Sequence, residues 1–129
     1  MNLDWSALER IEMSSWLLPA NDVFSYSLVI HGAQGRPNPD AMTLAQKVIE
    51  HYDMFTKAAS IHLHSLVNPK IVESGMEIDS FHFSDYGNSF KIHITLRDDL
   101  SARWLVRFIR RGGDYISDFS PCELTRTEQ

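Results

Sequence analysis

The sequence predicts a single α+β domain over residues 1–129, in which one long helix packs on one face of a mainly antiparallel sheet of five or six strands. Two observations carry this prediction. The run 39–67 repeats apolar residues every three or four positions, which is the period of a helix with one buried face. Segments on either side of this run alternate apolar and polar residues, which is the period of a half-buried strand. One helix is therefore available to cover the apolar face of the sheet.

Composition and charge narrow the classes of function. The chain has 129 residues, 43% of them hydrophobic, which suits one globular domain with a core of ordinary size. Its net charge of −5 argues against nucleic acid or an anionic membrane as partner. Cys122 is the single cysteine, so an intramolecular disulfide and a cysteine-based zinc site are excluded. We find no signal peptide and no membrane-spanning run, and we expect a cytoplasmic protein.

The segment before the long run has two readings. Trp5, Leu8, Ile11 and Trp16 fit a helical stripe. Ser14-Ser15 and Pro19 interrupt a long helix and favour extended structure instead. We expect extended structure. The next strand, 23–31, is clearer, because its even-numbered residues are all apolar: Phe24, Tyr26, Leu28 and Ile30.

The long helix has clear start and stop signals. Asn38 is placed to be its N-cap, Pro39 fits the first helical position, and Asp40 favours the positive end of the helix dipole. Pro69 ends the run after Val67. A continuous helix would be about 40 Å long and would cross several strands unless it breaks. The predicted buried stripe is Leu44, Val48, Tyr52, Phe55, Ala59, Leu63 and Leu66.

A meander of four strands is predicted after the helix. The first strand is 76–85, with a bulge near Asp79-Ser80 because Ile78 is out of phase with the residues after it. A turn at 86–88 leads to the strand 89–97, the most regular alternation in the chain.

The second half of this meander is a predicted tight hairpin. A strand over 103–110 turns at the glycine pair 112–113 and pairs back over 114–119, with Arg107 opposite Asp118. The polar tail that follows is expected to fray.

The outward side of the meander is the candidate binding surface. Arginine beside aliphatic side chains is a mixture that protein interfaces favour. The same residues also fit a solvated sheet face whose charges prevent pairing between sheets. The residues predicted to bind another protein are Lys91, His93, Arg97, Arg103, Leu105, Arg107 and Ile109.

The six histidines do not form a recognisable metal site. His62 and His64 point to different sides of a helix. His82 would lie opposite His93 if the turn between their two strands has two residues, or opposite Lys91 if this turn has four. Neither arrangement supplies a third ligand of suitable spacing, so we expect no metal and no other cofactor.

Motifs for catalysis are also missing from the sequence. It has no nucleophile-elbow pattern, no second histidine for a zinc-protease helix and no phosphate-binding loop. We therefore expect a non-enzymatic protein-binding module that uses the exposed sheet face or an edge. The alternative is a small enzyme or ligand-binding protein with a pocket between helix and sheet, in which His31, His51 or Tyr52 are the polar groups.

The order of elements is similar to that of many small bacterial α+β proteins, some of which are immunity proteins that bind and block a toxin. This likeness concerns the fold alone and identifies no residue. It implies an immunity-type or inhibitor role, with another protein or a second copy of the chain as partner.

Overall fold

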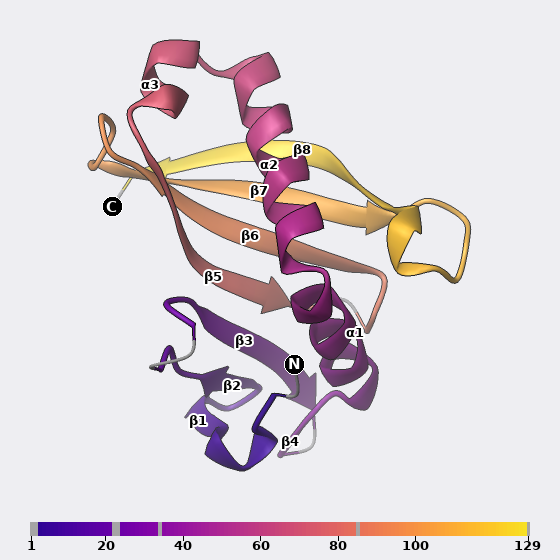
Figure 1. The fold of residues 1–129 in the computed structure, drawn as a ribbon. Helices are drawn as coiled ribbons and strands as arrows, with labels where there is room; N and C mark the ends of the chain where they lie inside the picture. Colours follow the sequence, from indigo (N-terminus) through magenta and orange to yellow (C-terminus); the bar gives the residue numbers. More distant parts are fainter. Residues whose placement is uncertain (1–2, 22–23, 34, 85, 129) are drawn as a thin grey trace.

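Eight strands form one sheet, and the two longer α-helices lie against one of its faces (Figure 1). The computed structural model describes residues 3–21, 24–33, 35–84 and 86–128, and all counts here refer to that part of the chain. Two 3₁₀ turns accompany the helices and strands. The elements are η1 (Trp5–Ala7), β1 (Glu9–Glu12), β2 (Ser15–Leu18), β3 (Ser27–Ala33), β4 (Arg36–Pro37), α1 (Pro39–Glu50), α2 (Tyr52–Leu66), α3 (Pro69–Glu73), β5 (Met76–Phe83), β6 (Ser89–Leu96), β7 (Ala102–Arg110), η2 (Ile116–Asp118) and β8 (Phe119–Glu128).

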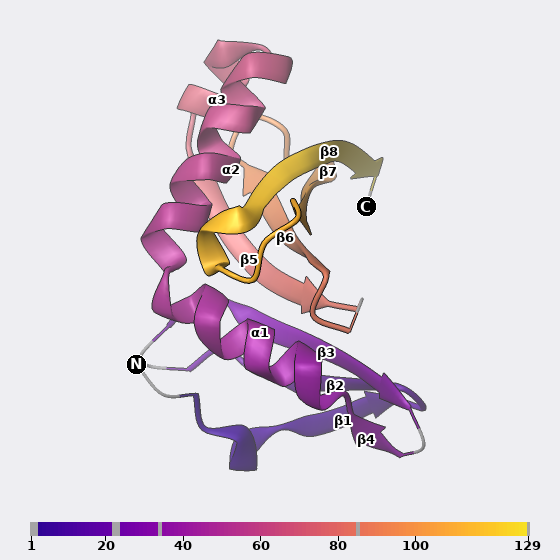
Figure 2. The same cartoon turned by 90° about the vertical axis from the view of Figure 1, so that its right-hand side faces the viewer.

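The sheet is mixed and has the order β1-β2-β3-β5-β6-β7-β8, with β4 pairing on β3. β3 and β5 are parallel, because the helices carry the chain from one to the other, and all other neighbours are antiparallel. α1 runs along β3, whereas α2 crosses β5 to β8 (Figures 1 and 2).

The prediction of one continuous helix is wrong, because the chain breaks at His51 (φ −115°, ψ 32°) between α1 and α2. The start is confirmed, with the Asn38 side chain accepting the Ala41 amide at 2.9 Å. The break occurs without glycine or proline. Instead the His51 ring bonds the Lys47 carbonyl at 2.9 Å, and Tyr52 turns inward to stack on Tyr26. One straight helix could not follow both halves of this twisted sheet.

The predicted number of strands is also wrong. The extended reading of the N-terminal segment is confirmed, and it supplies β1 and β2. The tail after Pro121, expected to fray, is part of the ten-residue strand β8. The tight hairpin is replaced by a loop over 111–118, closed by the Arg111 amide donating to the Asp118 carbonyl at 2.8 Å. Arg107 therefore lies opposite Glu123 rather than Asp118.

Other predicted details agree with the structure. The pairing of β5 with β6 shifts between Ile78 and Ser80, which confirms the bulge. The turn at 86–88 is present, with Tyr86 and Gly87 at positive φ. Tyr26, Leu28 and Ile30 face the core as the alternation predicts, whereas Val23 lies outside the described residues.

The core fills the space between the helices and the sheet. Its centre is a cluster of phenylalanine rings, in which Phe55 of α2 meets Phe90 and Phe108 edge to face at 5.1 and 5.5 Å. Most of the predicted helical stripe is buried there, but Leu66 is 61% exposed at the end of α2. None of the described helices combines the length and the apolar character needed to cross a membrane.

Candidate protein-binding face

The second face of the sheet carries no helix in the described ranges (Figure 2). Alternation along the strands sends one set of side chains into the core and the other set to this side. We call it the open face and define it by the residues that β2, β3, β5, β6 and β7 direct away from the helices: Ser15, Leu17, Ser27, Val29, His31, Glu77, Ser80, His82, Ser89, Lys91, His93, Thr95, Arg103, Leu105, Arg107 and Ile109.

Six of the seven residues predicted as a binding site lie together on the open face. The register pairs Lys91 with Arg107 and His93 with Leu105, so basic and aliphatic side chains are direct neighbours on β6 and β7. Arg103 and Ile109 extend the same row along β7. Arg97 is the exception, since it follows the end of β6 and its amide donates to the Gly75 carbonyl at 2.9 Å. The open face therefore keeps the predicted mixture without Arg97.

Two histidines stack at the centre of the open face. His82 is opposite Lys91, as the longer of the two predicted turns requires, and this register places it diagonally across from His93, which is opposite Ser80. The ring centroids are 3.7 Å apart and the planes differ by 9°. His82 Nε2 also lies 2.9 Å from the Ser80 hydroxyl, whereas Nδ1 of His93 is buried without a hydrogen-bond partner.

Burial keeps this histidine pair uncharged at neutral pH. Desolvation is the main cause that lowers the pKa of His82 to about 3, with smaller contributions from His93, His31, Arg103 and Lys91. Desolvation also lowers the pKa of His93 to about 4, with smaller contributions from Arg103 and Lys91. The sequence suggested ordinary surface histidines on a wet face. The structure instead places two flat neutral rings there, packed against each other.

The basic groups of the open face are only partly neutralised. Arg103 Nε lies 3.6 Å from Asp79, and Arg107 lies 3.7 Å from Glu123 of β8. Lys91 takes part in none of the ion pairs found among the described residues. The register also directs Glu9 and Glu77 to this side, opposite Leu17 and Thr95, so the open face as a whole has no excess of basic groups. Its basic groups are instead concentrated on β6 and β7, where Lys91, Arg103 and Arg107 form a basic row.

Apolar side chains complete the open face. Leu17, Leu105 and Ile109 are half-buried, and Val29 is buried at 8% exposure. They alternate with the polar groups along the strands, and a hollow of about 490 Å³ lies at one end of this face, lined by Glu77, Thr95 and Arg97. Mixed polar and apolar surfaces of this kind are typical of protein interfaces.

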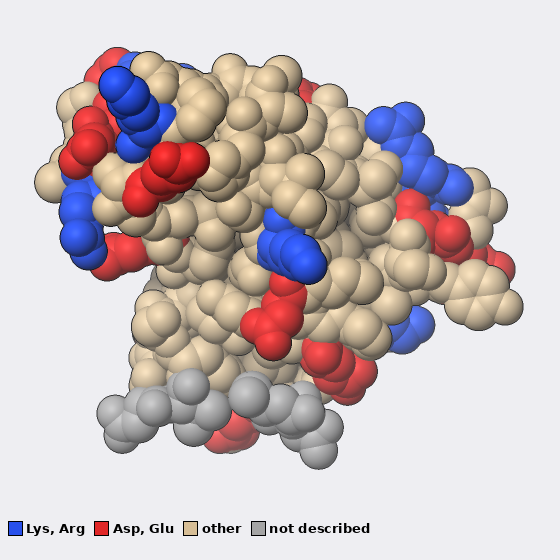
Figure 3. Space-filling model, turned by 45° about the horizontal axis from the view of Figure 1, so that its top comes forward, with Lys and Arg blue, Asp and Glu red and all other residues tan. Residues whose placement is uncertain are grey.

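The helix side offers a rival surface. In the view with the top of the molecule turned forward, acidic and basic side chains gather at the two sides, and a further basic and acidic group lie near the middle of the otherwise uncharged area between them (Figure 3). Met54, Ile61 and Leu66 of α2 are exposed there, at 40%, 61% and 61%. Met54 and Ile61, seven residues apart, share one face of α2, whereas Leu66, five residues further along, lies on another side.

The described residues bring together no group of three or more histidine, cysteine, aspartate or glutamate side chains suited to a metal ion. Ser15 bonds His31 at 3.1 Å, but no carboxylate orients that ring in the structure, and no other described residue completes a nucleophilic triad with it. No family model, no curated protein and no solved structure matches this chain. Function is therefore argued from the geometry of its surfaces.

Proposed function

We propose that this chain is a non-enzymatic protein-binding module of the inhibitor or immunity type, and that it binds its partner with the open face. The supporting observation is the uncovered side of the sheet, where Leu105 and Ile109 lie among Lys91, Arg103 and Arg107. Its five strands are about 4.8 Å apart and rise about 3.3 Å per residue, which gives a footprint on the order of 600 Å² before surface relief is counted. Specific interfaces bury about 800 Å² per partner, a value that the open face approaches once the relief of its side chains is included.

The partner is a different protein with an acidic rim around an apolar centre. The basic row of Lys91, Arg103 and Arg107 on β6 and β7 favours such a surface and would accelerate the encounter. A two-fold dimer through the same face would bring the basic rows of both copies together, which like-charge repulsion disfavours. The neutral pair His82–His93 adds flat area at the centre without a charge that must be desolvated.

The test compares matched substitutions on the two faces. Leu105→Glu places a negative charge in the open face, and Ile61→Glu makes the same kind of change on the exposed side of α2. Immobilised wild type, L105E and I61E are each exposed to lysate of the source cells, after thermal melts verify that all three are folded. We expect one partner to be retained in stoichiometric amount by wild type and I61E and lost by L105E.

Three results would argue against this function. One is the absence of any stoichiometric partner. Another is a partner lost with I61E and retained with L105E, which would move the interface to the helix side. The third is a wild-type dimer in light scattering that L105E converts to a monomer, which would make a second copy the occupant.

A further inference from the structure

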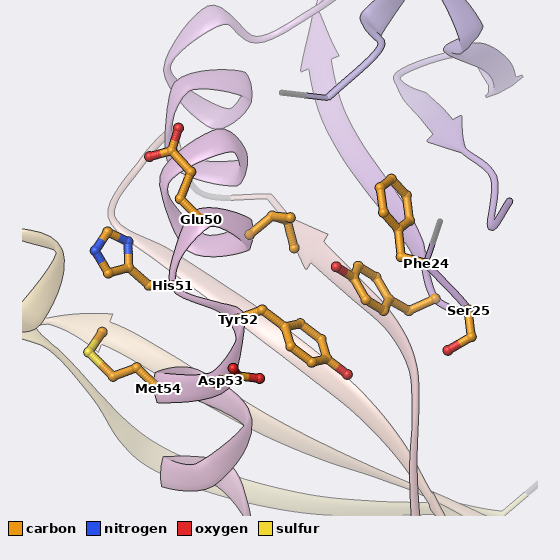
Figure 4. A pocket seen from close by; sticks show the side chains of 9 residues that line it. Phe24, Ser25, Glu50, His51, Tyr52, Asp53 and Met54 are labelled. Carbon is orange, nitrogen blue, oxygen red and sulfur yellow. The ribbon is translucent and has the colours of Figure 1, made fainter. Parts of the chain in front are cut away.

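The break between α1 and α2 opens a pocket of about 530 Å³ on the helix side, away from the open face (Figure 4). Small-molecule sites usually have volumes of about 300–1,000 Å³, so this pocket is large enough for a small ligand. It lies between the turn around His51 and the segment that leads into β3. Without the break, a continuous helix would not expose this space.

An aromatic stack forms the wall of the pocket. Phe24 stacks on Tyr26 at 5.1 Å with a 17° angle between planes, and Tyr26 stacks on Tyr52 at 4.8 Å and 11°. Phe81 of β5 supports the stack from below, with its ring edge-on to Tyr26 at 5.3 Å. Phe24 and Tyr52 are half-buried and line the pocket, so the stack offers apolar surface to a ligand.

The charge of the pocket is negative. Asp53 lies beside the Tyr52 ring, whereas Glu50 and His51 point away from the rings on the outer rim (Figure 4). No lysine or arginine is among the described residues that line the pocket, and Asp53 belongs to none of the ion pairs found there. The Asp53 carboxylate is therefore available to a ligand.

The tyrosine hydroxyls respond to the same environment. Burial raises the pKa of Tyr26 to about 12, with smaller contributions from Tyr52 and Asp53. Burial also raises the pKa of Tyr52, again with a contribution from Asp53. Both hydroxyls therefore stay protonated and uncharged at neutral pH, and among the described residues the Asp53 carboxylate is the negative charge beside the stack.

We propose that this pocket binds a small organic cation, whose apolar or aromatic part lies against Phe24 and Tyr52 and whose ammonium group faces Asp53. Ring faces and a carboxylate both attract an ammonium group. An anion would be repelled by Asp53 and Glu50, and a neutral ligand would gain from the rings alone. This site is separate from the open face and does not depend on the function proposed for it.

The test uses three probes with the same phenyl group and different charge. Phenethylammonium is the cation, 2-phenylethanol the neutral analogue and phenylacetate the anion. Each is titrated into isotopically labelled protein, and amide and aromatic NMR shifts are followed for Phe24, Tyr52 and Met54. We expect saturable shifts with the cation only, with a Kd on the order of 1 mM for a ligand of this size.

Variants separate the charge from the rings. Asp53→Asn keeps the shape of the side chain and should weaken cation binding about fivefold, as expected for a solvent-accessible charge pair. Phe24→Leu should weaken all binding to the pocket and leaves Asp53 in place. Glu73→Gln on α3 removes one exposed carboxylate away from the pocket and should leave the Kd unchanged. Amide dispersion and thermal melts verify that each variant is folded.

Several outcomes would overturn this proposal. They are the absence of saturable shifts with phenethylammonium, equal affinity for the alcohol, and tighter binding of phenylacetate, which would point to the N-terminus of α2 instead. Unchanged affinity in Asp53→Asn, or the same loss in Glu73→Gln, would overturn it as well. Loss of protein binding by the open-face variant L105E has no bearing on any of these results.

Discussion

The buried histidine pair makes the stability of the fold depend on pH, and between pH 7 and 4.5 its effect is measured above the pKa values of free carboxylates. His82 has a pKa of about 3 and His93 of about 4 in the folded chain, against 6.5 for a free side chain. Between those values the unfolded chain binds protons that the folded chain does not bind. The free energy of unfolding must therefore fall as the pH falls below 6.5 and level off below about 3.

The size of this effect follows from the pKa differences. Between pH 7 and 4.5 each histidine would contribute an upper limit of about 2.5 kcal/mol. His93 is the less buried of the two, so solvent screening reduces its share by roughly half. We expect wild type to lose on the order of 3 kcal/mol from the pair over this range. Replacing His82 with glutamine, which still offers a hydrogen bond to Ser80, should remove most of that loss.

Urea denaturation at pH 7, 6, 5 and 4.5 measures the effect. His64→Gln on α2 is the matched control, because it removes an exposed histidine from the helix side, and it should keep the wild-type slope. A wild-type free energy of unfolding that stays constant over this range would refute the reasoning. So would an identical slope in wild type and His82→Gln.

Three further substitutions test the fold. Phe55→Ala removes the ring that meets Phe90 and Phe108 and should lower the free energy of unfolding by about 3–5 kcal/mol in urea titrations. A loss of under about 1 kcal/mol would contradict the central place of this ring in the core. Gly32→Ala would place a Cβ 2.1 Å from a backbone carbonyl oxygen of β4, and should lower stability by about 1–3 kcal/mol, so an unchanged melting temperature would contradict that close approach. The hydrogen bond from Arg126 is the main cause of the lowered pKa of Asp99, and Asp99→Asn weakens this pairing. The substitution should therefore speed amide hydrogen exchange at the end of β8. Unchanged exchange would show that the pairing does not hold the strand.

Local signals in the sequence predicted much of the fold. Asn38 and Pro39 fixed the start of α1, and strict alternation over 89–97 identified β6 and its outward side. The phase slip at Ile78 located the bulge in β5. These features depend on residues close together in the chain, which is why they could be recognised without coordinates.

The features that sequence patterns missed depend on distant contacts. The break at His51 has no local breaker and follows from packing Tyr52 on Tyr26 and from the twist of the sheet. β8 looked like a fraying tail, because its polar residues are stabilised by pairing with β7 rather than by a core. An edge strand of this kind carries little alternation for a sequence pattern to detect.

The candidate sites also combine features that local sequence patterns predict with features that depend on distant contacts. Alternation alone placed Lys91, His93, Leu105 and Arg107 on one side, and the structure brings them together. The stacking of His82 on His93 could not be predicted, because it depends on the length of the turn between β5 and β6, which the sequence does not determine. His51 and Tyr52 were considered as pocket residues, but the pocket itself exists only because the helix breaks between α1 and α2.

Methyl NMR of the complex tests the central claim most directly. Leucine and isoleucine methyl groups are labelled, and the captured partner is titrated into the protein. The open-face interface predicts that the methyl signals of Leu105 and Ile109 shift while those of Ile61 and Leu66 on α2 stay in place. Shifts confined to Ile61 and Leu66 would contradict it, because the partner would then bind the helices and leave the open face in solvent.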